Sequence, residues 1–245
     1  MSESESHGGA NPGPSPDQGK GGLQLGVAER LRCPRCGPAY PLILLATQAG
    51  GQRVQTGELG CPNCRDRYPV KQGIADLRQA RERLGSQSGD HIRDGTPPVE
   101  VSSRLDLPTS SLAALLGVTQ GPARILLVGM EATVASGLLE AMQIEEGVEV
   151  VVAGPMGKVP NGLLSPCPAG VVVVGGSLPF QEGGFHAVAV DSDVGARWLD
   201  QLPPLLRSGA RLVVVRPGPE HPERLRSLGL ALLLNDPRAA VGVAT

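Results

Sequence analysis

Two short cysteine turns set the fold of the first third of the chain: Cys33-Pro34-Arg35-Cys36 and Cys61-Pro62-Asn63-Cys64. The turns are 24 residues apart, and each places a proline after its first cysteine. One such turn can offer two thiolates to a metal ion, and two turns that face each other form the tetrahedral four-sulfur site that structural zinc prefers. We therefore predict a structural zinc ion bound by Cys33, Cys36, Cys61 and Cys64.

Disulfide bonds and redox chemistry are the alternatives for these cysteines. The polar stretch from Met1 to Gly22 has no apolar run of the kind found in a signal peptide. No stretch of about 18 apolar residues predicts a membrane span. We expect a cytoplasmic location, where thiols stay reduced, and this favours a metal site. The fifth cysteine, Cys167, lies in the proline-rich segment Ser165-Pro166-Cys167-Pro168, and we expect it to be unpaired.

The composition argues against a nucleic-acid-binding surface. The 245-residue chain has a formal net charge of −2, which gives no long-range attraction to nucleic acid or to an anionic membrane. One tryptophan, two tyrosines and two phenylalanines are too few for a surface on which bases stack. The cysteine-containing part is locally basic, through Arg30, Arg32, Arg35, Arg53, Arg65, Arg67 and Lys71. We interpret these residues as a solvated face, and direct nucleic-acid binding is the function that we favour least.

The composition divides the chain into four parts. Residues 1–22 cannot bury apolar area, and we expect a disordered tail. Residues 23–79 hold both cysteine turns, and we expect a small zinc ribbon. Residues 80–108 are rich in charge, glycine and proline, which predicts a linker that is helical at its start. Residues 109–245 form the largest part.

This largest part has the pattern of an α/β domain. Short Val- and Leu-rich runs alternate with helical stretches, which is typical of a parallel sheet covered by helices on both faces. The predicted strands are 124–128, 148–152, 171–174, 187–190 and 211–215, and the predicted helices are 132–143, 194–206 and 220–228. Residues 230–234 and 240–244 predict a final antiparallel pair. The fold class is therefore α/β: a Rossmann-like parallel sheet preceded by a small ribbon.

The run after the second cysteine turn is Arg65-Asp66-Arg67-Tyr68-Pro69-Val70-Lys71-Gln72-Gly73-Ile74-Ala75-Asp76-Leu77. With the cysteine turns, it resembles the small zinc-ribbon proteins that bind and activate methyltransferases acting on tRNA, rRNA and translation release factors. The resemblance implies a protein partner, such as a methyltransferase or a translation or RNA-modification factor. The absence of a long apolar stretch predicts no association with a membrane. A ribbon of this size has little core, so zinc binding would supply folding free energy of roughly 10 kcal/mol or more. We expect Tyr68 and Ile74 to pack against the metal-binding turns.

Two later runs resemble the class I S-adenosylmethionine-dependent methyltransferases. They are Ser177-Leu178-Pro179-Phe180-Gln181-Glu182-Gly183-Gly184-Phe185-His186-Ala187-Val188 and Leu205-Leu206-Arg207-Ser208-Gly209-Ala210-Arg211-Leu212-Val213-Val214-Val215. They are similar to segments of quinone-biosynthesis methyltransferases and occur in the same order. The resemblance spans about residues 108–245 and implies the class I methyltransferase-like fold.

The cofactor motif of that family is degenerate in this chain. The first strand leads into Gly129-Met130-Glu131-Ala132-Thr133, where the family has a turn with three glycines. Gly129 matches the first glycine, but Glu131 and Thr133 replace the others, and Leu127 replaces an acidic residue. The second and third strands end without the acidic residues that would hold the ribose and the adenine. Gly129, Glu131 and Asp191 are the positions of the resemblance that would lie nearest to a cofactor.

Asp191 and Asp193 follow the fourth predicted strand, where such folds place substrate-side groups. We interpret Asp191 as a cap of the next helix rather than as a base or a cation ligand. His186 stands where the family has aspartate, and we interpret it as a strand-edge residue rather than as a catalytic base. The sequence therefore predicts no catalytic residue.

Three functions are compatible with this sequence. The first is a non-catalytic zinc-binding protein, a pseudoenzyme whose methyltransferase-like domain acts as a binding or scaffolding module. The second is an active methyltransferase with an atypical cofactor loop, and the third is a zinc-ribbon nucleic-acid binder. Because the polar anchors are replaced, we favour the first and expect that S-adenosylmethionine does not bind. If S-adenosylmethionine binds, the chain could be a methyltransferase, and if it does not bind, we expect no enzymatic activity.

Overall fold

The computed structural model describes residues 21–87, 107–144, 147–155 and 169–245. Nearly all of the expected tail, most of the expected linker and Cys167 lie outside these ranges. Within them, no helix is long and apolar enough to cross a membrane.

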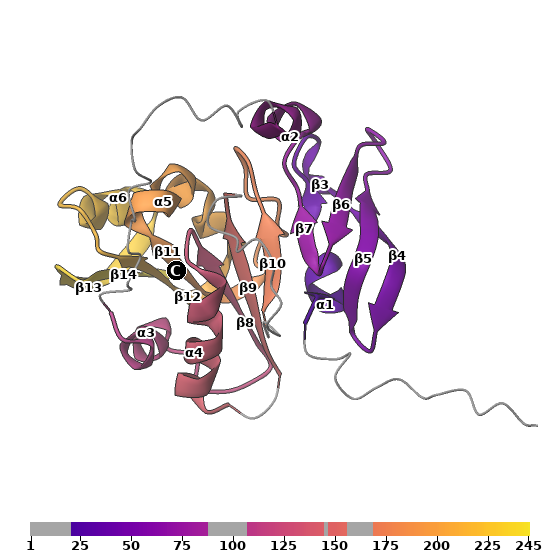
Figure 1. Ribbon diagram of the computed structural model, residues 1–245. Helices are drawn as coiled ribbons and strands as arrows, with labels where there is room; N and C mark the ends of the chain where they lie inside the picture. Colours follow the sequence, from indigo (N-terminus) through magenta and orange to yellow (C-terminus); the bar gives the residue numbers. More distant parts are fainter. Residues whose placement is uncertain (1–20, 88–106, 145–146, 156–168) are drawn as a thin grey trace, which may run out of the picture.

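The N-terminal part, here called the ribbon (residues 21–77), is made of short antiparallel strands and one helical turn (Figure 1). Its elements are β1 (Leu23–Gln24), α1 (Leu25–Ala28), β2 (Arg32–Cys33), β3 (Gly37–Pro41), β4 (Ile43–Gly50), β5 (Arg53–Gly60), β6 (Arg67–Lys71) and β7 (Ile74–Asp76). Helix α2 (Ala80–Gln87) follows at the start of the expected linker.

The remaining described residues form the α/β part (residues 107–245). Its strands are β8 (Ala123–Val128), β9 (Val148–Gly154), β10 (Gly170–Val173), β11 (Phe185–Asp191), β12 (Leu206–Val215), β13 (Leu230–Asp236) and β14 (Ala239–Ala244). Its α-helices are α3 (Thr109–Leu116), α4 (Ala132–Met142), α5 (Ser192–Gly195) and α6 (His221–Ser227). The apolar runs in the sequence predicted every one of these strands to within a few residues.

The strand order identifies the architecture. Strands β10, β9, β8, β11 and β12 are parallel neighbours in that order, and β14 and β13 complete the sheet as an antiparallel pair. Counted from β8 as the first, the parallel strands run 3-2-1-4-5, the doubly wound order of nucleotide-binding folds. The α/β, Rossmann-like fold class predicted from the sequence is confirmed.

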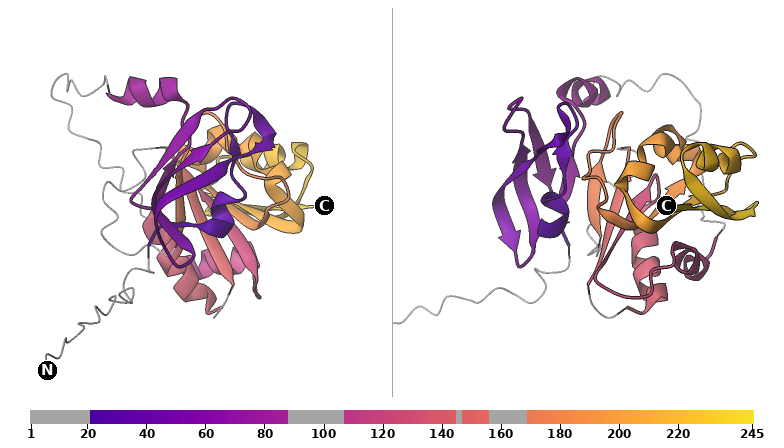
Figure 2. Two further views of the ribbon diagram at one scale, coloured as in Figure 1. Left: turned by 90° about the vertical axis from the view of Figure 1, so that its right-hand side faces the viewer. Right: turned by 180° about the vertical axis from the view of Figure 1, so that it is seen from behind.

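The ribbon joins this sheet directly. Strand β7 pairs with β10 in parallel, with Ile74 opposite Val171 and Asp76 opposite Val173, so all the described strands except β2 and β3 belong to one sheet. Strands β2 and β3 form a separate pair, and Figure 2 shows the ribbon lying beside the α/β part. The segments are far apart in sequence, and no local signal predicted their pairing. The division of the chain into domains at residues 23–79 and 109–245 remains a prediction. The structure shows in addition that strands of both parts belong to one sheet.

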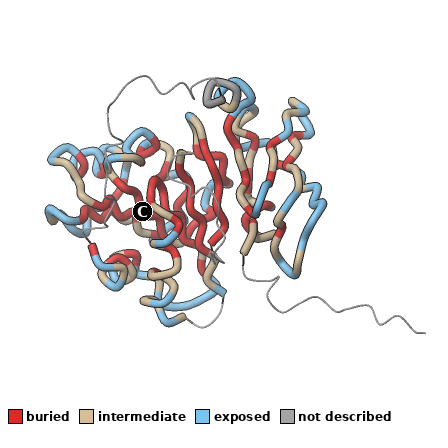
Figure 3. Tube along the Cα trace, viewed as in Figure 1, coloured by how far each residue is buried: buried red, intermediate tan, exposed pale blue. Residues whose placement is uncertain are grey.

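Apolar side chains cover both faces of the sheet, and the buried residues are concentrated along its central strands (Figure 3). On one face, Leu112 of α3 and Leu138 of α4 pack with Ile125 and Leu127 of β8. On the other face, ribbon residues and the segment after β11 share a single core, in which Leu31 and Tyr68 lie in the same cluster as Trp198. The ribbon is therefore stabilised in part by burial against the α/β part.

The predicted helix over residues 194–206 is wrong. The chain forms the single turn α5, then 3₁₀ turns over Ala196–Gln201 and Pro203–Leu205. Pro203 and Pro204 lack backbone N–H groups, so an α-helix cannot continue through them. Trp198 and Leu199 become buried from these short turns.

Candidate functional site

The four cysteines meet at one point of the ribbon. Their sulfur atoms all lie within 4.8 Å of one another. The Sγ atoms of Cys33 and Cys64 are 3.6 Å apart, and those of Cys36 and Cys61 are 3.8 Å apart. A tetrahedron of thiolates at the zinc–sulfur distance of about 2.3 Å has edges of roughly 3.8 Å. The donor set and its spacing therefore fit one tetrahedral metal ion.

Neighbouring groups orient these sulfurs. The backbone N–H of Cys36 lies 3.4 Å from Cys33 Sγ, and Asn63 Nδ2 lies 3.3 Å from Cys36 Sγ. The hydroxyl of buried Tyr68 is 3.7 Å from Cys33 Sγ, which confirms the expected packing of this ring against the cysteines. Such outer contacts fix the direction of metal ligands.

Ile74, the other residue expected at this place, is not there. It lies on β7 and packs against the apolar core on the other face of the sheet, the core to which α3 and α4 also contribute. The prediction for Ile74 is wrong because pairing of β7 with β10 directs this side chain away from the cysteines.

The thiols differ in acidity because of their surroundings. Burial raises the pKa of Cys33, and it raises that of Cys64 to about 12. Burial also acts to raise the pKa of Cys61, but the N–H groups of Cys64 and Asn63 outweigh it and lower that pKa to about 7. Four clustered thiols therefore do not ionise together on their own, and a divalent cation would supply the charge that deprotonates them. Four thiolates leave no open coordination position, so such an ion would have a structural role.

A second candidate site lies at the carboxyl ends of the parallel strands. In doubly wound sheets, ligands bind in the crevice where the strand order reverses, here between β8 and β11. Gly129 directly follows β8 and has a φ of 72°, and its N–H donates to the carbonyl of Ala153 near the end of β9. Glu131 takes the N-cap position of α4, and its carbonyl accepts from the N–H of Val134.

Asp191 holds the opposite side of this crevice. It is buried, and its Oδ1 accepts from the N–H of Asp193 at 2.9 Å and of Val194 at 3.4 Å, which confirms its interpretation as a helix cap. Its other carboxylate oxygen pairs with the Arg216 guanidinium at 2.6 Å, and Arg216 also pairs with Asp193 at 3.0 Å. The two carboxylates thus share the single positive charge of Arg216.

The turn α5 lies close to Gly129 at this crevice. A Cβ atom at Gly129 would lie 3.0 Å from the backbone nitrogen of Gly195 and 3.0 Å from Val194 Cβ. Gly195 in turn allows close approach, since a Cβ there would lie 2.3 Å from Val190 Cγ2. The turn α5 therefore packs directly on the glycine turn after β8.

Two further side chains occupy the adjacent ends of the strands. The Glu82 carboxylate of α2 accepts from the N–H of Gly176 at 3.3 Å and lies against Gly175, where a Cβ would be 2.3 Å from it. The fully buried indole of Trp198 donates from Nε1 to the carbonyl of Gly175 at 3.1 Å. Sequence reasoning missed both residues, although Glu82 also accepts from the N–H of Gln79, a spacing of three that signals a capping box.

This arrangement does not fit S-adenosylmethionine. Leu127, at the position of the family's acidic residue, is fully buried in the helix-side core. Gly154 and Val174, at the ends of β9 and β10, offer no carboxylate for a ribose or an adenine. The space next to Gly129 is taken by Val194 and Gly195. No catalytic step through this cofactor follows from these residues.

His186 lies at the other end of the strands. It is the second residue of β11, and its Nδ1 accepts from the backbone N–H of Arg124 at 3.0 Å. Burial, and then the charges of Arg207, Arg124 and Arg30, lower its pKa. No carboxylate is within ion-pair distance of its ring among the described residues. The interpretation of His186 as a strand-edge residue remains a prediction.

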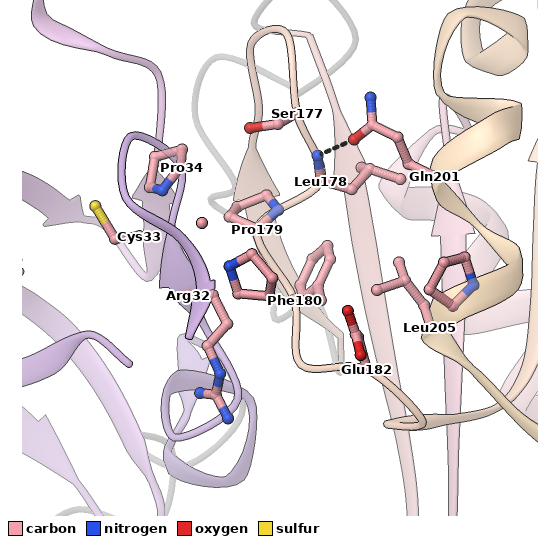
Figure 4. A pocket seen from close by; sticks show the side chains of 13 residues that line it. Arg32, Cys33, Pro34, Ser177, Leu178, Pro179, Phe180, Glu182, Gln201 and Leu205 are labelled. Atoms are coloured by element: carbon pink, nitrogen blue, oxygen red, sulfur yellow. Dashed lines mark hydrogen bonds between the residues drawn. The ribbon is translucent and has the colours of Figure 1, made fainter. Parts of the chain in front are cut away.

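A cavity of about 280 Å³ separates the ribbon from the loop after β10 (Figure 4). Its walls are mainly apolar: Pro34 of the ribbon faces Pro179 and Phe180 of the loop. The loop is fixed on both sides, since the Leu178 N–H donates to Gln201 Oε1 at 2.9 Å and the Arg32 N–H donates to the Pro179 carbonyl at 2.8 Å. The run that resembles methyltransferases thus serves as a contact with the ribbon.

The basic residues of the ribbon are partly neutralised. Arg35 pairs with Asp66 at 3.3 Å, and Arg67 pairs with Glu58 at 3.1 Å. Arg53 donates to the carbonyl of Gly22. These contacts agree with the interpretation of a solvated face.

Comparison with known proteins adds little beyond the fold. No protein-family model matches the chain, and no curated protein matches it. Among solved structures, a SAM-dependent methyltransferase from Aquifex aeolicus is 13% identical, covers 58% of this chain and 93% of its own, and has a TM-score of 0.44. An O-methyltransferase from Thermotoga maritima is 11% identical, with coverages of 83% and 85% and a TM-score of 0.43.

A third similar structure is a complex from Haloferax volcanii between the Trm112 methyltransferase activator and a putative methyltransferase. It is 12% identical, with coverages of 57% and 90% and a TM-score of 0.44. At such values a structural likeness does not decide activity. The fold assignment rests on the strand order, and the functional assignment rests on the residues of the two sites.

Proposed function

We propose that this protein is a zinc-stabilised, non-catalytic methyltransferase-like module that binds a protein partner. The protein would hold a structural zinc ion in the ribbon. Its cofactor crevice would be blocked by the turn α5, and the remaining surface would bind the partner.

The four-thiolate geometry supports zinc. Zinc takes four thiolates in a tetrahedron, whereas magnesium and calcium prefer oxygen ligands. Cys33 and Cys61 are buried, so the metal would lie within the ribbon core rather than on its surface.

The close packing of α5 against Gly129 is the observation that carries the non-catalytic part of the proposal. Gly129, Gly195 and Val194 are in direct contact at the place where a doubly wound fold admits its ligand. Binding a nucleoside there would require α5 to move, together with the Asp191 cap and the Arg216 pairs that hold it.

The sheet edge supports a protein partner. Strand β10 would be an edge of the α/β part, but β7 already pairs with it. Among the described strands, the free edge of the ribbon is β4, where Ile43 and Leu45 are 54% and 59% exposed. An apolar edge strand of this kind is a template for strand addition by another chain. A methyltransferase or a translation or RNA-modification factor is the class of partner that the ribbon's resemblance suggests.

Hydrogen exchange with and without S-adenosylmethionine tests this function. We expect the amides of Gly129, Val194 and Gly195 to be protected in the free protein, and 1 mM cofactor, on the order of the weak limit of specific binding, to leave their exchange unchanged. New protection at the ends of β8 and β11 on adding the cofactor would favour an active methyltransferase instead.

A further inference from the structure

Three arginines and one histidine gather at the end of the sheet opposite to the crevice. Arg124 and His186 are the second residues of β8 and β11, and Arg207 is the second residue of β12. Arg30 comes from the ribbon, just after α1, and its charge acts on both Arg124 and His186. Neither the metal site nor the crevice uses these side chains.

The histidine orients a donor into this cluster. Because Nδ1 of His186 accepts from the backbone N–H of Arg124, the proton of the neutral ring is on Nε2. Nη1 of Arg207 lies next to that Nε2. Two donors therefore face each other, and an acceptor group is required to satisfy both.

The charges in the cluster do not balance. Glu149 pairs with Arg124 at 2.7 Å, but among the described residues neither Arg30 nor Arg207 forms an ion pair. The Nε atom of Arg30 is buried and has no hydrogen-bond partner in the described part of the chain. Burial, followed by the charge of Arg124, lowers the pKa of Arg30, although the carboxylates of Glu149 and Glu29 act in the opposite direction.

We propose that Arg30, Arg124, Arg207 and His186 form a binding site for a phosphate group. Three guanidinium groups outnumber the two carboxylates that act on this cluster, Glu149 and Glu29, so the cluster keeps a surplus of positive charge, which suits an anionic phosphate. Planar guanidinium groups donate pairs of hydrogen bonds to phosphate oxygens, and the Nε2–H of His186 supplies a further donor. The phosphate could belong to a small phosphomonoester or to a nucleic-acid backbone, since both present the same oxygens.

Calorimetric titration with inorganic phosphate, at constant ionic strength set with chloride, tests the site. Arg207→Met removes an exposed guanidinium and leaves the core intact, and Arg238→Met, at the β13–β14 turn, is the matched control. We expect Arg207→Met to weaken phosphate binding about tenfold or more, because a hydrogen bond to a charged group is lost. We expect Arg238→Met to bind as the wild type does.

Nuclear magnetic resonance of the His186 ring gives an independent readout. Bound phosphate should raise the pKa of His186, since an anion favours the charged ring. Equal phosphate affinity in wild type and Arg207→Met, or an unchanged His186 pKa at saturating phosphate, would overturn the proposal. A parallel titration with a sugar monophosphate and with a single-stranded RNA identifies the source. If only one of these two ligands binds in a way that depends on Arg207, the site is assigned to that ligand. If neither ligand binds and inorganic phosphate gives no response, the proposed phosphate site is refuted.

Discussion

Loss of the proposed ribbon metal is predicted to destabilise the α/β part as well. Metal binding by a four-thiolate site contributes about 10 kcal/mol or more to folding, which is comparable to the whole stability of a domain. A Cys61→Ser/Cys64→Ser variant should therefore be unable to fold its ribbon. Without the ribbon, β7 leaves β10, whose residues 171–173 then lose their pairing on one side.

The loss of stability in the α/β part can be worked out from the exposed edge of β10. Loss of two ladder hydrogen bonds and partial exposure of the buried Val172 and Val174 would cost the α/β part about 4 kcal/mol. For a protein of this length that cost lowers the melting temperature by roughly 8–16 °C. Apolar contacts of Leu31 and Phe180 across the same core add to it.

Trp198 reports the effect, because it is the only tryptophan of the chain and its indole donates to the carbonyl of Gly175, two residues beyond β10. We expect the melting temperature reported by Trp198 fluorescence to be lower by roughly 8–16 °C in the cysteine variant. Cys167→Ser, outside the predicted ligand set, is the control and should melt as the wild type does. A variant that has lost its metal but keeps the wild-type Trp198 transition would refute the coupling of ribbon and sheet.

Three further predictions concern individual side chains. Gly129→Ala should lower the free energy of unfolding more than Gly183→Ala does. Both glycines have a positive φ, which costs an alanine roughly 1–2 kcal/mol, but only the Cβ at position 129 would meet neighbouring atoms. Equal losses of stability in urea denaturation would argue against close packing of α5 on Gly129. Trp198→Ala should lower the stability by about 3–5 kcal/mol, as measured by circular dichroism in urea, and a loss below about 1 kcal/mol would contradict its burial. His186 has a lowered pKa in the folded state, so its contribution to stability is complete above its unfolded pKa of about 6.5 and is lost as the pH falls towards the folded value. His186→Asn should flatten this part of the pH dependence, and an unchanged profile would show that the ring titrates normally.

The sequence allowed the cysteine cluster and the strands to be predicted because their signals are local. The cysteine turns define their own geometry, and the runs Ile125-Leu126-Leu127-Val128 and Val150-Val151-Val152 are apolar enough to be central strands. The cap at Asp191 was also predictable, since a short acidic side chain precedes a helical turn.

Long-range contacts were not predictable in the same way. Pairing of β7 with β10 joins residues nearly a hundred positions apart, and nothing in the Ile74-Ala75-Asp76 run specifies its partner. Closure of the crevice depends on Gly129 and Gly195 coming together, and each glycine alone is compatible with an open turn. The structure also changes the interpretation of Leu127. An aspartate placed there to restore a cofactor anchor would be buried in the core beneath α3 and α4, and its buried carboxylate would destabilise the protein.

Calorimetric titration of S-adenosylmethionine into the metal-loaded protein tests the central claim most directly. The closed crevice and the missing acidic anchors predict no binding with a dissociation constant of about 10 μM or tighter, which corresponds to roughly 7 kcal/mol. Metal content and the Trp198 emission establish in the same sample that the protein is folded. A dissociation constant of about 10 μM or below, with one site per chain, would contradict the account and identify the chain as a cofactor-binding methyltransferase.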